Sequence, residues 1–191
     1  MYKICRTKQS TQRQRAIEKG LLSLMSTRRY EDITISDLCA HLQIPRRVFY
    51  RYFSGKDGAL YALLDHLMMD FQLTDLLPGA EKIAAPGDMA RYFHFWYQNK
   101  PLLDALSRSG LNGVLVERAT SFALRERMMP RYMLSWDSQV QQLAMSFTIS
   151  GLMSMVLRWH QQGFLQSPEE MCRIATGLLT NPLINRETHR D

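Results

Sequence analysis

Residues 34–60 read TISDLCAHLQIPRRVFYRYFSGKDGAL, and the pattern predicts a short helix, a tight turn and a second short helix. Thr34 can cap the first helix, and Asp37 three residues later completes a capping box. We expect the second helix to begin at Pro45. It carries a cluster of arginine and tyrosine side chains: Arg46, Arg47, Tyr50, Arg51 and Tyr52. Guanidinium groups match phosphate oxygens and guanine edges, so the stretch predicts a helix-turn-helix unit that binds DNA.

The positive charge of the chain is concentrated around this stretch. The 191 residues carry a formal net charge of +6. Residues 1–56 hold 12 Lys and Arg against 4 Asp and Glu, whereas residues 57–191 hold 12 against 14. A basic face on one small domain is typical of nucleic-acid-binding proteins. On charge alone, a solvated basic arm is an equal alternative, and the motif favours DNA.

The rest of the sequence indicates an all-α protein. Apolar residues recur at helical spacing, and helix breakers separate the segments. We expect helices over about residues 11–26, 34–42, 45–53, 56–73, 88–98, 102–110, 112–128, 138–157 and 167–180. The predicted organisation is a three-helix DNA-binding domain over residues 1–56 and a helical dimerisation and effector domain over residues 57–191.

The sequence offers little for catalysis or metal binding. Cys5, Cys39 and Cys172 are far apart and odd in number, which favours a reducing cytoplasm over a disulfide framework or a metal site. The basic start of the chain lacks the apolar run of a signal peptide. We find no catalytic constellation and no glycine-rich phosphate loop. We therefore expect neither an enzyme nor a cofactor.

Residues 138–157 contain no charged residue, but their serines and glutamines make the segment too polar for a membrane span. A helix that is apolar nearly all round is usually buried on two sides. We expect one side to face its own domain and the other a partner subunit, which predicts a homodimer. Ser146, Ser150 and Ser154 recur every four residues and would let a second helix approach. A stripe of Met171, Ile174 and Leu178 in the last helix adds to this surface.

The helix-turn-helix stretch resembles the N-terminal signature of the TetR family of bacterial transcription regulators. The matching residues are Thr34, Ile35, Leu38, Ile44, Phe49, Tyr50, Tyr52, Phe53 and Lys56. The runs FHFWYQNKPLLDAL (93–106) and SGLMSMVLRWHQQGFLQSPEEM (150–171) are similar to the C-terminal domain of a subgroup common in Firmicutes. The resemblance implies a ligand-responsive repressor that binds a palindromic double-stranded operator as a homodimer.

By position, the resemblance also implies roles for individual residues. The residues that match DNA-contacting positions are Thr34, Ser36, Arg46, Arg47, Tyr50, Arg51, Tyr52 and Lys56. Three departures from the family pattern concern the turn and the second helix. Gln43 stands where glycine is usual, so a left-handed backbone there would be mildly strained. Pro45 replaces a capping residue, and Arg47-Val48 replaces a frequent Gly-Thr pair.

The family builds a ligand cavity between its fifth, seventh and eighth helices, and the resemblance implies one here. The candidate lining residues are Phe93, Trp96, Tyr97, Arg118, Phe122 and Phe147. Arg118 would anchor an anionic effector; plain core packing, and an ion pair of Arg118 with Glu117 or Asp104, are the alternatives. Two other functions stay open: a co-regulator that works through a protein partner, and a small helical enzyme that uses the aromatic cavity.

Overall fold

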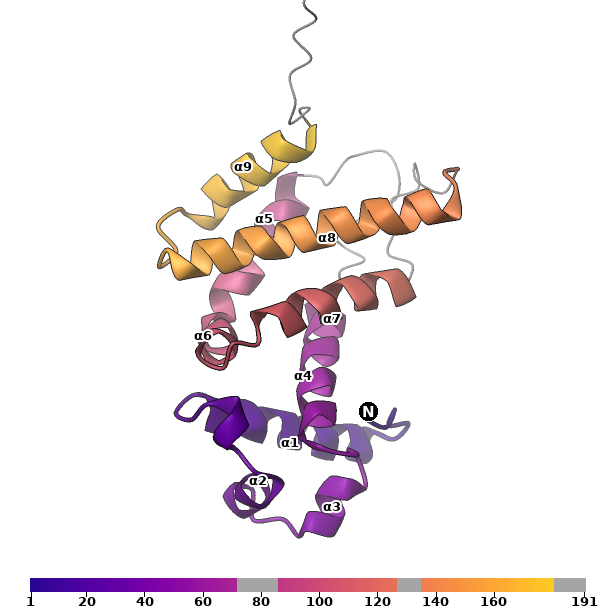
Figure 1. The fold of residues 1–191 in the computed structure, drawn as a ribbon, viewed down its shortest axis with the longest axis vertical. Coiled ribbons are helices and arrows are strands. Elements are labelled where there is room, and N and C mark those ends of the chain that lie inside the picture. The colour runs from indigo at the N-terminus through magenta and orange to yellow at the C-terminus, as the bar shows by residue number, and fades with distance from the viewer. Residues whose placement is uncertain (72–85, 127–134, 181–191) are drawn as a thin grey trace, which may run out of the picture.

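The computed structural model describes residues 1–71, 86–126 and 135–180, and within these ranges every regular element is a helix (Figure 1). The elements are α1 (Lys8–Met25), the short 3-10 helix η1 (Tyr30–Asp32), α2 (Ile35–His41), α3 (Arg46–Tyr50), α4 (Lys56–Phe71), α5 (Pro86–Gln98), α6 (Lys100–Arg108), α7 (Asn112–Arg125), α8 (Ser138–Gln161) and α9 (Pro168–Thr180). The predicted all-α fold is confirmed. The predicted ends at residues 73 and 128 lie outside the described residues.

Local capping sets where several helices begin. The predicted box at α2 is present: the Asp37 backbone N–H donates to Thr34 Oγ1 at 3.0 Å, and the Thr34 N–H donates to Asp37 Oδ2 at 2.8 Å. Ser167 and Glu170 form the same arrangement at α9. A further box at Thr7 begins α1 three residues before the predicted start at residue 11. Each box satisfies backbone N–H groups that have no partner inside the helix.

The turn between α2 and α3 has the expected left-handed residue, but α3 begins one residue later than predicted. Gln43 has φ +53°, the left-handed conformation that glycine adopts without strain. The N–H of Ile44 donates to the carbonyl of Cys39 at 3.0 Å and closes the turn. Pro45 is the residue before α3 rather than its first helical residue, so the prediction that the helix begins at Pro45 was wrong by one position. Pro45 has extended backbone geometry, which leaves its carbonyl free to accept from the N–H of Val48.

Helix α4 joins the two halves of the molecule. In Figure 1, α1, α2 and α3 lie at one end, α4 rises from them, and α7 crosses its far end beneath α8. The helix packs against α1 and against α7. Helices α7 and α8 run side by side, and α5 packs against α9. Because α4 is shared in this way, the boundary at residue 56 stays a prediction.

Helix α8 has two different sides. Its inner side is buried in the core through Met145, Ile149, Leu152, Met153, Val156 and Trp159. Its outer side exposes large apolar residues, including Val140, Leu143 and Phe147. By length and composition alone α8 could cross a membrane, with a mean hydropathy of 1.3 over 18 residues. The core helix of a soluble protein passes the same test, so this property is weak support for a membrane span.

Candidate nucleic-acid interface

Helix α3 separates an apolar side from a cationic side. Phe49 is fully buried, and Phe53 just after the helix is nearly so. The outer side carries two pairs with the spacing of one helical turn, Arg46 with Tyr50 and Arg47 with Arg51, and all four side chains are exposed. The core thus fixes the helix while its cations point to solvent. We call these four residues, together with exposed Thr34 and Ser36 at the start of α2, the reading face.

Arg46 and Tyr50 are already in contact on this face. The guanidinium donates to the Tyr50 hydroxyl at 3.2 Å and lies 5.8 Å from the centre of its ring. This hydrogen bond is the main cause that raises the pKa of Arg46 above its ordinary value. The pair holds a fixed positive charge and a phenolic oxygen side by side. Such a pair is suited to an anionic partner, because hydrogen bonds to ionised groups are stronger than neutral ones.

The start of α2 is held in place by a local charge. The hydrogen bonds from the Thr34 hydroxyl and backbone N–H lower the pKa of Asp37 to about 2. Asp37 is therefore ionised at neutral pH, and its charge lies at the N-terminal end of the helix dipole, where it is favourable. The Thr34 hydroxyl serves this cap, and Thr34 as a residue is exposed.

Tyr52 does not lie on the reading face. Only 4% of its surface is exposed, and it packs in the core beside Phe53. The N–H of Lys3 donates to its backbone carbonyl at 2.9 Å, so the N-terminal segment covers it. The predicted DNA contact by the Tyr52 side chain finds no support in this position. The periodicity of α3 explains the difference, because Tyr52 is three residues after Phe49 and shares its buried side.

Lys56 is also directed inward. Its ammonium group donates to the carbonyls of Tyr30 at 2.5 Å and Ile33 at 2.6 Å, with a longer contact to Glu31. It also lies 4.2 Å from the centre of the Tyr30 ring, and its removal from water lowers the pKa of the amine. The ammonium group is therefore bound by backbone carbonyls of the protein itself. The structure gives Lys56 an internal role instead of the predicted free phosphate-contacting position.

The end of the molecule formed by α1, α2, α3 and the first turns of α4, which we call the reading end, is tied to α7 by a buried carboxylate that the sequence did not predict. Asp65 on α4 is 1% exposed and accepts from Arg118 Nε at 3.0 Å, with a second, shorter bond from Arg118 Nη2. The Tyr2 hydroxyl donates to the same carboxylate at 2.6 Å, and Arg125 is 3.6 Å away. Burial, followed by this hydrogen bond, raises the pKa of Tyr2. The available signal was a single acid within the apolar run of α4, ALYALLDHLMM.

The six predicted effector residues differ in burial and in their contacts within the protomer. Phe93, Trp96 and Phe122 are buried in the core, whereas half of Tyr97 is exposed. Phe147 is 68% exposed on the outer side of α8. Arg118 is paired with Asp65 rather than with Glu117 or Asp104. The structure therefore separates a buried aromatic group on α5 and α7 from two residues that face solvent.

Among the buried side-chain polar atoms of the described residues, two have no well-formed hydrogen bond: Trp96 Nε1 and His160 Nδ1. The Trp96 indole is close enough to the Tyr92 hydroxyl to influence its pKa, which burial raises, while that hydroxyl donates to the sulfur of Met153 at 3.1 Å. The other ring nitrogen of His160 is 2.7 Å from Asp104. In the part of the chain that the structure describes, no three His, Cys, Asp or Glu side chains form a group that could hold a metal ion.

Comparison with known proteins supports the fold. No protein-family model and no curated protein sequence matches the chain. Solved structures do match it. The dihydroxyacetone kinase operon activator DhaS is similar at 16% identity and a TM-score of 0.56, over 87% of this chain and 93% of that one.

Two further structures are of TetR-family proteins. A TetR-family transcriptional regulator from Streptomyces coelicolor matches at 21% identity and a TM-score of 0.53, over 86% of this chain and 78% of that one. The TetR family repressor AlkX from Dietzia sp. strain DQ12-45-1b matches at 16% identity and a TM-score of 0.53, over 85% of this chain and 91% of that one. Identities this low support a likeness of fold alone, and the chain has the TetR-like fold, with a helix-turn-helix unit at one end and a helical domain at the other.

Proposed function

We propose that this protein is a transcription regulator that binds double-stranded DNA as a homodimer, with α3 in the major groove. The observation that carries the proposal is the group of four exposed arginine and tyrosine side chains on the reading face, at α3 and the residue that ends it, whose opposite side is buried in the core. Arginine makes the commonest specific contact to guanine, through O6 and N7. Thr34 and Ser36 lie at the start of α2, where phosphate contacts commonly fix the position of such a unit.

The proposal of a homodimer is based on the apolar outer side of α8. Its exposed residues recur at intervals of three and four and so form one stripe along the helix: Val140, Leu143, Phe147, Gly151 and Ser154. Ile174 and Leu178 of α9 are also about half exposed. Contiguous exposed apolar surface of this kind marks interaction sites. A groove of about 370 Å³ between α8 and α9, lined by Gly151, Ser154 and Met171, would receive side chains of the second copy.

The serine spacing used to predict this surface needs one correction. The hydroxyl of Ser150 lies 3.2 Å from that of Thr120 on α7, so Ser150 faces its own protomer. Gly151 and Ser154 are exposed. A Cβ atom at Gly151 would meet no other atom of the protomer within 4 Å. The position at which a partner helix would approach closely is therefore Gly151.

A small-molecule effector would act through the C-terminal helices. The buried donor that it would meet on α5 is Trp96 Nε1, because this group has no well-formed bond of its own. A shift of the C-terminal helices that includes α7 would reach the reading end through Arg118 and Asp65, which join α7 to α4. A dimer whose reading ends move in this way binds its operator differently with and without effector. With the operator occupied, we expect repression.

The experiment that tests DNA binding uses duplexes selected by the wild-type protein from a random pool. Arg47→Ala and Arg51→Ala should each weaken binding to the selected duplex by about 1–3 kcal/mol if the residue reads a base. Arg47→Lys is the matched variant, because it keeps the charge but lacks the guanidinium group that forms bidentate hydrogen bonds with a base edge. Arg173→Gln on α9, remote from the reading face in Figure 1, is the control. If the wild-type protein selects no duplex, the proposal is wrong, and a co-regulator acting through a protein partner becomes the better interpretation.

A further inference from the structure

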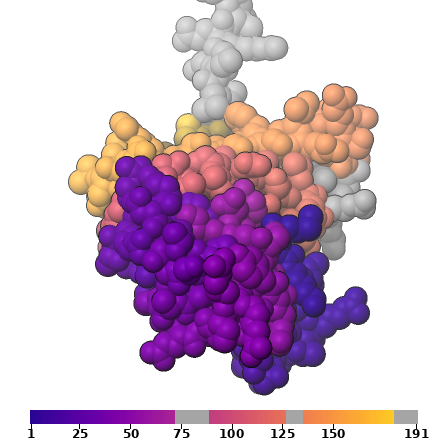
Figure 2. All heavy atoms as spheres, turned by 60° about the horizontal axis from the view of Figure 1, so that its bottom comes forward, coloured from indigo at the N-terminus to yellow at the C-terminus, as the bar shows by residue number. Residues whose placement is uncertain are grey.

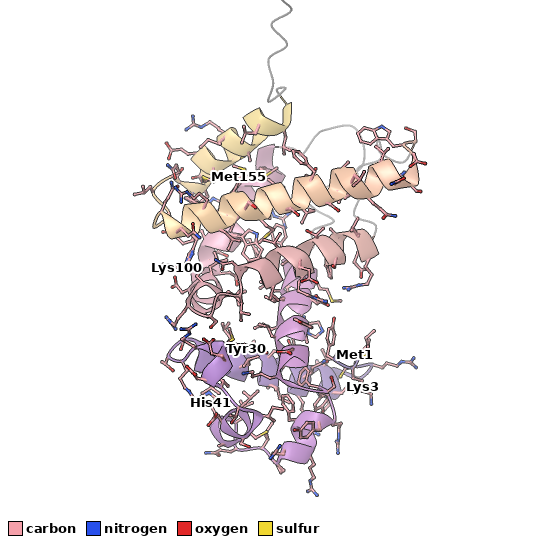
Figure 3. The ribbon with its side chains drawn as sticks, viewed as in Figure 1. Met1, Lys3, Tyr30, His41, Lys100 and Met155 are labelled. Atoms are coloured by element: carbon pink, nitrogen blue, oxygen red, sulfur yellow. The ribbon has the colours of Figure 1, made fainter. Side chains whose placement is uncertain are left out.

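The first seven residues of the chain are firmly seated against the helix-turn-helix unit. Tyr2 forms an antiparallel bridge with Phe53. The Ser54 N–H donates to the Met1 carbonyl at 3.1 Å, and the side chain of Gln14, itself 1% exposed, donates to the Lys3 carbonyl at 3.0 Å. In Figure 3, Met1 and Lys3 lie beside the lower end of α4, above α3. We call residues 1–7 the arm.

The seat includes a close backbone approach. A Cβ atom at Gly58 in the first turn of α4 would lie 2.4 Å from the carbonyl oxygen of Met1. Only glycine permits this approach without movement, because no real Cβ makes so short a contact. With the Tyr2 hydroxyl on the buried Asp65 carboxylate, the arm is held at both its backbone and its side chains. Its position relative to α3 is therefore fixed before any partner binds.

The seated arm creates a basic groove next to the reading face. The groove encloses about 530 Å³, and ten residues from the arm, α1 and the end of α3 line it. Four of the ten are cations, Lys3, Arg6, Arg13 and Arg51, and none is acidic. All four are exposed. In Figure 2 the N-terminal residues, in indigo, flank the purple surface of the helix-turn-helix unit.

Four cations without a lining carboxylate attract an anion, and their spread along a groove matches a row of anions better than a single one. Duplex DNA carries one negative charge per about 1.7 Å of its axis. Arg51 belongs both to the reading face and to this groove. DNA in contact with Arg51 would therefore lie next to the groove.

We propose that the arm, together with Arg13 of α1, is a second DNA-binding element, in which Lys3, Arg6 and Arg13 hold the phosphate backbone beside the segment that α3 reads. The proposal rests on the proposed function, since it takes the same duplex as its partner. The arm adds affinity and orientation rather than sequence choice, because phosphates carry no direct sequence information. Its seat on Phe53, Gly58 and Asp65 supplies the preorganisation, so little ordering cost falls on binding.

The test compares wild-type protein with the triple variant Lys3→Ala, Arg6→Ala and Arg13→Ala on the selected duplex and on a random duplex, across salt concentrations. The backbone bonds of the arm stay in place in this variant. We expect binding to both duplexes to weaken about tenfold or more at low salt. The slope of log K against log salt should flatten by about 0.9 for each phosphate that the variant no longer neutralises. Arg173→Gln removes a charge on α9 and should change neither quantity.

A second variant displaces the arm without removing charge. Gly58→Ala should weaken binding to both duplexes. Gly113→Ala should leave this binding unchanged, because a Cβ atom there meets no atom within 4 Å. Thermal unfolding of each variant checks that it is folded. If the triple variant binds both duplexes with wild-type affinity and slope, the arm is not a DNA-binding element, although the proposed function stands. If the wild-type protein binds no duplex, both proposals fail.

Discussion

The outer side of α3 and the outer side of α8 are both uncovered in the protomer, but they differ in length and chemistry. Helix α3 has five residues and exposes arginine and tyrosine; α8 has 24 and exposes valine, leucine and phenylalanine. Charge left in water at one end points to an anionic partner, whereas apolar area left in water points to a second protein surface. The two surfaces therefore fit different partners, DNA and a second copy of the chain.

The two surfaces also differ in how they are supported. The reading face depends on local features, namely the Thr34 cap, the left-handed Gln43 and the buried Phe49. The face of α8 depends on the packing of α7 beneath it. Asp65 connects the two halves through its bonds with Arg118 and Tyr2. Variants that act on one surface, on the other, or on this connection can separate these contributions.

The largest effect is expected at the connection itself. Asp65→Ala leaves the Arg118 guanidinium without its buried partner, so we expect the free energy of unfolding to fall by about 3–5 kcal/mol. Asp70→Ala is the matched control on the same helix, because its pair with Arg15 lies at the surface and is expected to contribute about 0–1 kcal/mol. Urea unfolding measures both variants. Equal losses would show that the Asp65 network does not join the two halves.

The next largest effect is expected on the α8 surface alone. Gly151→Arg places a charge in the middle of the exposed stripe, where a partner would bury it. We expect the dimer dissociation constant to rise at least about 100-fold, since an unpaired buried charge costs several kcal/mol. Gly113→Arg on α7 makes the same change at another open position and should leave the dimer intact. Sedimentation analysis that finds a wild-type monomer, or a dimer in both variants, would contradict this placement of the interface.

A smaller effect is expected at the edge of the reading end. Lys56→Ala should lower the free energy of unfolding by about 1–3 kcal/mol, because the carbonyls of Tyr30 and Ile33 lose a charged donor. It should leave the salt dependence of DNA binding unchanged, because the Lys56 ammonium group already binds carbonyls of the protein and neutralises no phosphate. Denaturant unfolding and salt titrations on the random duplex measure the two quantities. A flatter salt slope with unchanged stability would return Lys56 to the phosphate contact that its sequence position first suggested.

The sequence predicted the features whose partners lie close along the chain. The capping boxes at Thr34 and Ser167 join residues three apart, and the strained turn at Gln43 follows from one missing glycine. The exposed cations of α3 could be predicted in the same way. Such features need only helical periodicity and local hydrogen bonding, and both can be read from the order of the residues.

The features that the sequence did not predict join distant residues. Tyr2 and Asp65 are 63 positions apart, and Arg118 is 53 further on. The inward direction of Lys56 depends on η1 and the residue after it, Ile33, which lie 23 to 26 residues earlier. The pattern could suggest that a cation or an acid was functional, but not which distant group would pair with it. The different exposures of the predicted effector residues could not be predicted for the same reason, because the side of α8 on which Phe147 lies is set by how α7 packs.

The smallest effect is a pH dependence confined to the reading end. The Asp37 pKa, lowered from 3.8 to about 2 by bonds from Thr34, means that the folded state favours the ionised carboxylate. A carboxylate whose pKa is lower in the folded state stabilises the protein at any pH above the pKa of the unfolded state. This contribution is lost as the pH falls to the pKa of the folded state. The advantage of wild type over Asp37→Asn should therefore be constant above about pH 4 and shrink between about pH 4 and 2. The other carboxylates are present in both proteins, so their titration cancels in the difference.

Thr34→Ala should remove most of the pH dependence of that difference, because the bonds that hold the carboxylate are then reduced. Dimerisation through α8 should be the same in wild type and in both variants, since Thr34 and Asp37 lie in the helix-turn-helix unit at the other end of the molecule (Figure 1). A difference between wild type and Asp37→Asn that stays constant down to pH 2 would mean that the cap does not depend on the charge.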